Sequence, residues 1–133
     1  MRYLLDTNIC IYLLRQQPPE VIGRLEQLNE GDAVMSVVTY AELRAGLEIQ
    51  GQHRAHDAHV LALLVQRIPV LPFDTGAAEH YGVLRAAVRE RSRNALDRLI
   101  AAHALAVEAV LVTNNVADFK DYPGLRIENW VGA

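Results

Sequence analysis

The sequence predicts an α/β fold with three layers, in which helices cover both faces of a central, mostly parallel sheet. Short apolar runs alternate with longer segments whose apolar residues recur at helical spacing. Strands that alternate with helices favour a parallel sheet, because parallel neighbours need a crossover that is usually helical. The chain has 133 residues, which suits one core, so we expect residues 1–133 to form a single domain.

The expected strands are short apolar runs bounded by polar or turn-forming residues. They are residues 2–5, 33–38, 69–73, 110–112 and 126–130. The last of these is expected at an edge of the sheet. Residues 113–120 are mostly polar and are expected to form a loop.

The expected helices follow recognisable start signals. Apolar residues recur at helical spacing from Ile9, and the prolines at 18 and 19 open a second helix. Thr39 and Glu42 have the spacing of a capping box. Asp74 and Asn94 are the expected caps of two later helices. The expected ranges after the first helix are residues 18–28, 39–50, a polar helix ending near 64, 74–91 and 94–107.

Composition excludes several classes of protein. No run of about eighteen uninterrupted apolar residues occurs, and Asp6 interrupts the apolar start, so we expect neither a membrane span nor a secretory signal. Cys10 is the single cysteine, which fits a cytoplasmic protein and excludes a disulfide framework. The net charge of −3 argues against coating nucleic acid by bulk electrostatics.

Basic residues nevertheless gather in one stretch. Arginines are concentrated between positions 85 and 98, at Arg85, Arg89, Arg91, Arg93 and Arg98. Such a run is typical of a solvated helix face. Phosphate contact is the alternative, because guanidinium groups bind phosphate oxygens in a bidentate fork.

Acidic and amide side chains stand where strands end. Ligands of open parallel sheets collect at the carboxyl ends of the strands. Asp6 directly follows the first strand, Asn115 lies just after the fourth, and Glu42 is one helical turn beyond the second. Each acid could instead serve a helix start, where the dipole favours negative charge by about 0.3–1 kcal/mol. Gly46, one turn after Glu42, leaves room for a ligand.

Asp97 lies at the edge of an apolar helical stripe and is therefore expected to be partly buried. The stripe contains Leu96, Leu99, Ile100, His103, Ala104 and Val107. His103 on this stripe is expected to be a core histidine with its hydrogen bonds satisfied.

Three acids drawn to one crevice repel one another unless a cation neutralises them. Asp6, Glu42 and Asp97 therefore suggest a hard divalent ion bound through carboxylate oxygen, either Mg²⁺ or Mn²⁺. An ion held in this way can activate water for attack on a phosphodiester.

Four segments together resemble the PIN-domain toxins of bacterial VapBC toxin–antitoxin modules. They are MRYLLDTNICIYLL, SVVTYAELRAGLE, LDRLIAAHALA and LVTNNVADF followed by GLRIENW. The resemblance covers nearly the whole chain. It implies the three-layer PIN fold, Mg²⁺-dependent endoribonuclease activity against structured RNA such as a tRNA loop, a VapB-type antitoxin that inhibits it, and a homodimer that contacts DNA only through the antitoxin.

The resemblance also implies site residues. The family's acids match Asp6, Glu42 and Asp97, with Asp6 and Asp97 as direct metal ligands. Its polar positions match Thr7, Asn8, Thr113 and Asn115. Many members carry an acid where this chain has Asn115, so either Asn115 or Asp118 takes the fourth position. The segment from Arg91 to Leu96 also replaces a glycine-containing approach to the late aspartate.

Two other functions remain open at this point. In one, the chain acts mainly in a DNA-binding, autoregulatory complex with its antitoxin and has weak or no nuclease activity, which the amide at Asn115 favours. In the other, Asp6 serves phosphotransfer. Asn8 replaces the second acid of a phosphatase pair, and Lys120 is the only lysine a receiver-type pocket could use, so phosphotransfer fits less well.

Overall fold

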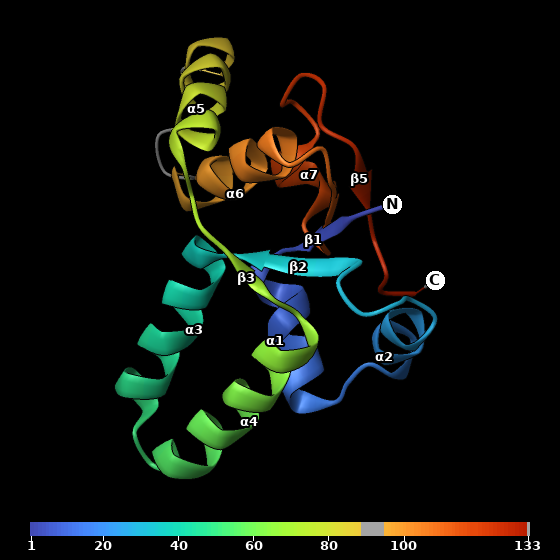
Figure 1. The fold of residues 1–133 in the computed structure, drawn as a ribbon, viewed down its shortest axis with the longest axis vertical. Helices are drawn as coiled ribbons and strands as arrows, with labels where there is room; N and C mark the ends of the chain where they lie inside the picture. The colour runs from blue at the N-terminus through green and yellow to red at the C-terminus, as the bar shows by residue number, and fades with distance from the viewer. Residues whose placement is uncertain (89–94, 133) are drawn as a thin grey trace.

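A five-stranded sheet forms the centre of the molecule (Figure 1). The computed structural model describes residues 1–88 and 95–132. The strands are β1 (Tyr3–Leu5), β2 (Ala33–Ser36), β3 (Val70–Leu71), β4 (Val110–Val112) and β5 (Ile127–Glu128). Their spatial order is β3-β2-β1-β4-β5, and all four neighbouring pairs are parallel. The prediction of a mostly parallel sheet is confirmed.

Helices cover both faces of this sheet, which confirms the three layers (Figure 1). One face carries α1 (Thr7–Arg15), α2 (Pro19–Glu26), α3 (Val37–Gln50) and α4 (Arg54–Arg67). The other carries α5 (Thr75–Ala87), α6 (Ala95–Ala106) and the short α7 (Val116–Phe119).

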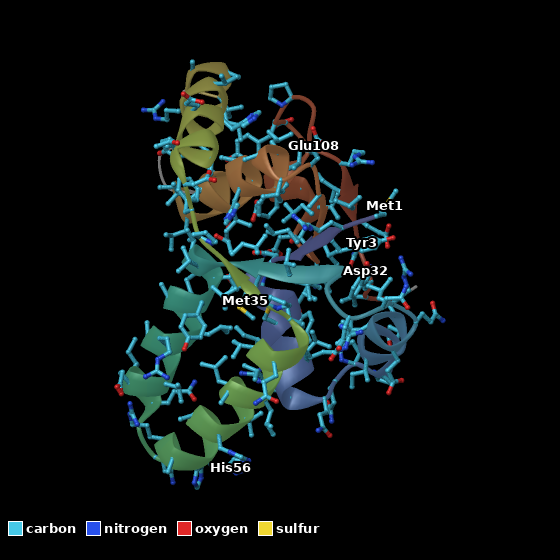
Figure 2. All side chains as sticks on the ribbon, in the orientation of Figure 1. Met1, Tyr3, Asp32, Met35, His56 and Glu108 are labelled. Atoms are coloured by element: carbon cyan, nitrogen blue, oxygen red, sulfur yellow. The ribbon has the colours of Figure 1, made fainter. Side chains whose placement is uncertain are left out.

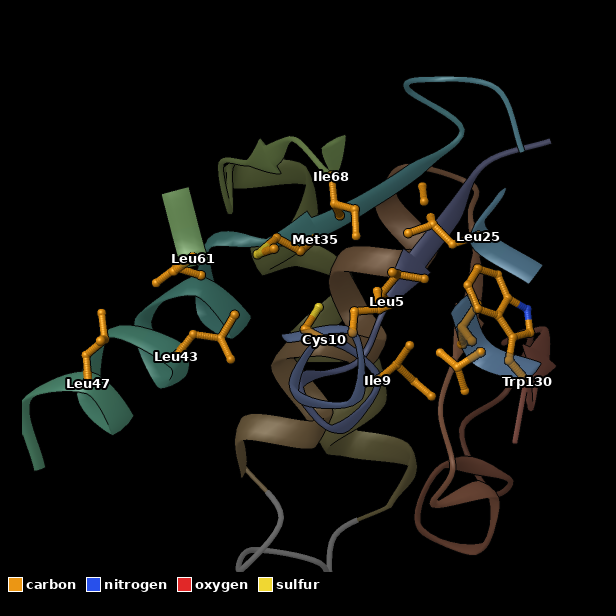
Figure 3. Close-up of a cluster of buried hydrophobic side chains, with 14 residues drawn as sticks. Leu5, Ile9, Cys10, Leu25, Met35, Leu43, Leu47, Leu61, Ile68 and Trp130 are labelled. Carbon is orange, nitrogen blue, oxygen red and sulfur yellow. The ribbon is translucent and has the colours of Figure 1, made fainter. Parts of the chain in front are cut away.

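Alternation along the strands divides the buried apolar residues into two clusters. Successive strand side chains point to opposite faces. Leu5 and Met35 therefore pack with α1 to α4, together with Leu43, Leu61 and Ile68 (Figure 3). Leu4 and Val34 instead pack against α5, α6 and α7 on the other face. The sheet thus fixes the helices on its two sides relative to one another.

The carboxyl-terminal segment is fastened to α2 by an aromatic and ionic cluster. Trp130 is fully buried and its ring centroid lies 5.9 Å from that of Tyr3. The guanidinium of Arg24 lies over both rings and forms an ion pair with Glu128. The Trp130 indole N–H donates to the same carboxylate at 2.8 Å. These contacts secure β5 at the edge of the sheet.

Several element boundaries differ from the sequence predictions. The second strand ends at Ser36, and Ser36 caps α3 by accepting a hydrogen bond from the Val38 amide at 3.1 Å. Thr39 lies inside the helix, so the predicted capping box with Glu42 is wrong. Ser36 caps α3 in place of Thr39, because its hydroxyl at the end of the strand lies beside the first free N–H groups of the helix.

Two further predictions need correction. The expected loop 113–120 contains the single turn of helix α7, whose Phe119 is buried. Leu96, placed on the apolar stripe of α6, is 49% exposed because it lies in the first turn, beyond the packed surface. The predicted cap Asn94 and the predicted helix end at Arg91 lie outside the described residues. So do Arg89 and Arg93 of the arginine-rich stretch.

Within the two described ranges, we find no helix with the length and apolar character required to cross a bilayer.

Candidate active site

The candidate site lies where the direction of strand addition reverses. From β1 the chain adds β2 and β3 on one side, and then returns to add β4 and β5 on the other. In open parallel sheets the carboxyl ends of the two strands at such a reversal form a crevice. Asp6 follows β1 and Thr113 follows β4, so both residues stand at this point.

Two hydrogen-bond donors fix the carboxylate of Asp6. It caps α1, with the Thr7 amide donating to its Oδ1 at 2.7 Å, and the Thr113 hydroxyl donates to Oδ2 at 2.8 Å. The expectation that Asp6 could cap a helix is confirmed, and the cap does not remove it from the site. Burial raises the pKa of Asp6, the two hydrogen bonds oppose this, and the charges of Glu42 and Asp118 raise it further.

Glu42 is held beside Asp6 by a threonine. The Thr7 hydroxyl donates to Glu42 Oε1 at 2.5 Å and lies 3.3 Å from the Thr39 hydroxyl. Thr7 therefore contacts both carboxylates, through its amide and its side chain. Because Thr39 is inside α3 and fully buried, it also fixes the approach of α3 to α1.

Asp97 approaches from the other face of the sheet, in the first turn of α6. It is half-buried, as predicted. Burial raises the pKa of its carboxyl to about 6, helped by the charges of Asp6, Asp118 and Glu42 in that order. Four carboxylates from separate segments of the chain are thus close enough to influence one another.

The structure distinguishes between Asn115 and Asp118, the two candidates for the fourth position of the site. Asn115 is exposed, and its backbone amide donates to the Thr113 hydroxyl at 2.9 Å. Asp118, in α7, is the residue whose charge acts on both Asp6 and Asp97. Of the two alternatives left open by the sequence, the electrostatics favour Asp118. Asn115 acts through the backbone to hold Thr113.

The donor set suits a hard divalent cation in its chemistry. All the facing groups are carboxylate or hydroxyl oxygens, which Mg²⁺ and Mn²⁺ prefer. The ion pairs found between described residues, Arg24–Glu128 and Arg54–Glu48, involve none of these acids. In the described part of the chain, no three Asp, Glu, His or Cys side chains are yet close enough to enclose an ion. Ligation would therefore require the carboxylates to draw together.

Comparison with known proteins gives the same family as the sequence motifs. Residues 3–125 match the PIN domain family. The chain is 38% identical to the tRNA(fMet)-specific endonuclease VapC of Shigella flexneri over 132 residues, covering 98% of each chain. It is 34% identical to ribonuclease VapC2 of Rickettsia felis, again covering 98% of each.

The chain belongs to the VapC toxins of the PIN-domain family.

Solved structures agree with this assignment to VapC. The crystal structure of VapBC2 from Rickettsia felis, bound to a DNA fragment from their promoter, superposes with a TM-score of 0.86 at 32% identity, covering 98% of this chain and 99% of that one. VapBC-1 from nontypeable Haemophilus influenzae gives a TM-score of 0.86 at 37% identity, covering 98% of each chain.

A groove lies beside Glu42 of this VapC chain, between α1, α3 and α4. Its volume is about 240 Å³, and Glu42 and Gly46 stand on its α3 side. A Cβ atom added to Gly46 would meet no atom within 4 Å, which confirms the room expected beside Glu42. Apolar walls come from Leu43, Leu47 and Leu61. His56, near the end of the α3–α4 pair remote from the sheet, lines its outer part (Figure 2).

Sequence reasoning did not connect Ser36 and His103 with this VapC site. Ser36 is in a strand as predicted, but its role as the cap of α3 was missed, although a serine before a helical stretch is itself a cap signal. His103 is a core histidine as predicted, with Nδ1 2.7 Å from the Ser36 hydroxyl. Only this nitrogen is satisfied. For its Nε2, no hydrogen-bond partner is found among the described residues.

Proposed function

We propose that this PIN domain is a Mg²⁺- or Mn²⁺-dependent endoribonuclease and the toxin of a VapBC module. The observation that carries the proposal is the convergence of Asp6, Glu42, Asp97 and Asp118 on one end of the sheet, where burial first, and the charges of the neighbouring acids second, raise the pKa of Asp6 and Asp97. Such a cluster is costly in the folded state and is relieved when a cation binds. The named activities of the relatives, ribonuclease and endonuclease, support phosphodiester cleavage in RNA.

The proposed metal ligands are those that the family resemblance implies. Asp6 and Asp97 are the direct metal ligands, and Glu42 completes the set. A cation bound there would lower the pKa of a water molecule and stabilise charge on the phosphate during attack. Thr113 and Thr7 keep the Asp6 and Glu42 carboxylates oriented through the hydrogen bonds described above. Orientation of this kind lowers the cost of assembling the reacting groups.

We propose a tRNA as the substrate class. The Shigella flexneri relative, at 38% identity, is named for tRNA(fMet). RNA recognition by proteins is directed mainly at single-stranded loops, whose bases can be turned outward. The negative net charge of this chain suits a local contact with such a loop better than coverage of a long duplex.

Cleavage of purified tRNA, mapped at nucleotide resolution, tests the nuclease. Cleavage is expected with Mg²⁺ or Mn²⁺ and should be abolished by chelator. Asp6→Asn should lower the rate by about 100-fold or more, since loss of even an outer-shell partner of a metal costs about 10–100-fold. Asparagine remains a good helix cap, so the fold is retained. Glu79→Gln, at an exposed position of α5, is the control. Cleavage that persists in chelator contradicts the proposal.

A VapB-type antitoxin is the proposed inhibitor, and the groove beside Glu42 is its proposed binding surface. The superposed relatives are VapBC complexes, and Glu42 of the candidate site lines the groove. A bound peptide segment there would block access to Glu42. Gly46→Leu should fill the groove and weaken antitoxin binding, measured by calorimetry. Gly46→Ala is the matched control, and equal binding by wild type and Gly46→Leu would place the antitoxin elsewhere.

The alternative is a subunit that acts mainly in a DNA-binding, autoregulatory assembly. The amide at Asn115, exposed in place of an acid, favours this alternative. A chain that binds no Mn²⁺, cuts no RNA and yet forms a tight operator-binding complex with its antitoxin would establish it. The homodimer, and DNA contact through the antitoxin alone, stay predictions that mass measurement of the free chain and of the complex would test.

A further inference from the structure

A buried hydrogen bond connects the two helices that bring acids to the site from opposite faces of the sheet. His103 on α6 and Ser36 at the start of α3 are 1% and 0% exposed. The distance from His103 Nδ1 to Ser36 Oγ is 2.7 Å. Neither residue faces solvent, and neither contacts RNA or metal in the proposed reaction. The bond therefore needs an explanation within the fold.

The positions of the two partners relative to the acids suggest that explanation. Glu42 lies six residues after Ser36 on α3, and Asp97 lies six residues before His103 on α6. At about 1.5 Å per residue, each acid is about 9 Å along its helix from the bond. A helix is stiff over less than two turns, so a shift at the bond is passed to the carboxylate.

The Ser36 hydroxyl also determines where α3 begins. It accepts from the Val38 amide at 3.1 Å while it contacts His103. One hydroxyl thus sets both the start of α3 and the distance from α3 to α6. The other fixed points of the site, Thr7 with Glu42 and Thr113 with Asp6, lie on α1, α3 and the end of β4. Neither of these two contacts involves α6.

We infer that the His103–Ser36 hydrogen bond is a positioning element that holds Asp97 on α6 at the correct distance from Glu42 on α3. His103 and Ser36 are positioning residues and touch neither substrate nor metal. This inference rests on the proposed function only for its effect on RNA cleavage, since the geometry of the two helices is independent of it. An error of about 1 Å in such a site can lower a rate by about 100-fold.

Two substitutions at His103 separate hydrogen bonding from packing. His103→Asn places an oxygen or nitrogen on Cγ, where Nδ1 is attached in histidine, and can keep the bond to Ser36. His103→Phe removes the bond but keeps a ring, and with it the edge-to-face contact with Phe73 at 5.5 Å. If His103 contributes only packing, His103→Phe should retain more activity than His103→Asn. If His103 positions Asp97 through the hydrogen bond, His103→Asn should retain more.

We expect His103→Phe to lower kcat for tRNA cleavage by about 10–100-fold, with a small change in KM, and to weaken Mn²⁺ binding measured by calorimetry. His103→Asn should remain within a few-fold of wild type. Ser36→Ala should resemble His103→Phe, and the double variant should lose no more activity than either single one. Leu84→Ala, in the same core, is the control that lowers the melting temperature without lowering kcat.

The inference is overturned if His103→Phe retains activity, if both His103 variants lose it equally, or if the losses follow the melting temperatures. Crystal structures of the metal-free variants provide the readout that does not depend on the nuclease. His103→Phe should displace the first turn of α6 from α3, and His103→Asn should not. If wild type cleaves no RNA, the proposed function has failed, and these structures still decide the positioning role.

Discussion

Thr113 shows how much of the site depends on one hydroxyl group. It is fully buried, donates to Asp6 Oδ2 and accepts from the Asn115 amide. Thr113→Val keeps the shape but leaves both partners unsatisfied, so we expect a loss of about 1–3 kcal/mol in the free energy of unfolding. It should also raise the pKa of Asp6 further, because the Thr113 hydrogen bond lowers it.

Urea denaturation measures the first effect, and a carboxyl-resolved NMR titration of the metal-free protein measures the second. Thr113→Ser retains the hydroxyl and is the matched control. Equal stability of the valine and serine variants would show that the hydroxyl contributes little to the fold.

Asp97 makes the stability of the metal-free protein depend on pH. Its carboxyl pKa is raised from 3.8 to about 6, first by burial. The unfolded chain releases this proton near pH 3.8, whereas the folded state keeps it until about pH 6. The contribution of Asp97 to stability is therefore fully present below pH 3.8 and is lost as the pH rises through about 6.

We expect the urea midpoint of the metal-free protein to fall across this pH window. Asp97→Asn should make the profile flatter, and saturating Mg²⁺ should offset the decline in wild type by binding the charged form. A profile that Asp97→Asn leaves unchanged would assign the decline to other groups.

The sequence was sufficient to identify the acidic residues of the site, because its apolar runs show where the strands end. Asp6 and Glu42 could be placed there from apolar runs alone. The choice between Asn115 and Asp118 could not be made, because the direction of a side chain in a single turn such as α7 depends on packing around Phe119, far along the chain from β1.

Among the helices, α3 offers a direct test of what glycine costs in a helix interior. Gly46 is in its interior, where glycine costs conformational entropy, and an added Cβ meets nothing within 4 Å. Gly46→Ala should therefore stabilise the protein by about 0.5–1 kcal/mol. Thermal and urea unfolding measure this change. Gly31→Ala, at a φ of +88°, is the opposing control and should destabilise.

The presence and the approximate ranges of the helices were predictable from the sequence, whereas their first residues were less predictable. Two polar residues, Ser36 and Thr39, could both cap α3, and local spacing with Glu42 pointed to the second. The fold uses Ser36, because the pairing of β2 with β3 ends there and the amides that follow have no strand partner. Tertiary pairing, which one segment does not contain, therefore decides the boundary.

For the molecule as a whole, the carboxyl-terminal cluster should contribute strongly to stability. Trp130 is fully buried among Tyr3, Arg24 and Glu128. Trp130→Ala removes a large side chain and leaves Arg24 and Glu128 with fewer partners, so we expect a loss of about 3–5 kcal/mol. Urea denaturation measures it, with exposed Gln52→Ala as a control expected within about 0.5 kcal/mol.

The fold class followed from the alternation of strands and helices, but the strand order did not. Nothing in the local pattern states that β4 returns to pair with β1 while β3 stays at the far edge. That choice brings Asp6 and Thr113 together at the carboxyl ends of β1 and β4. The crevice was expected at the strand ends in general terms, and its location between β1 and β4 required the structure.

The central pairing of β1 with β4 has a consequence for biosynthesis. During translation, residues 1–50 leave the ribosome with Asp6 and Glu42, but without the strand that supplies Thr113. A nascent chain has no complete set of acids until α6, α7 and β4 have emerged. We therefore expect the proposed metal site to be incomplete until these late elements have been synthesised.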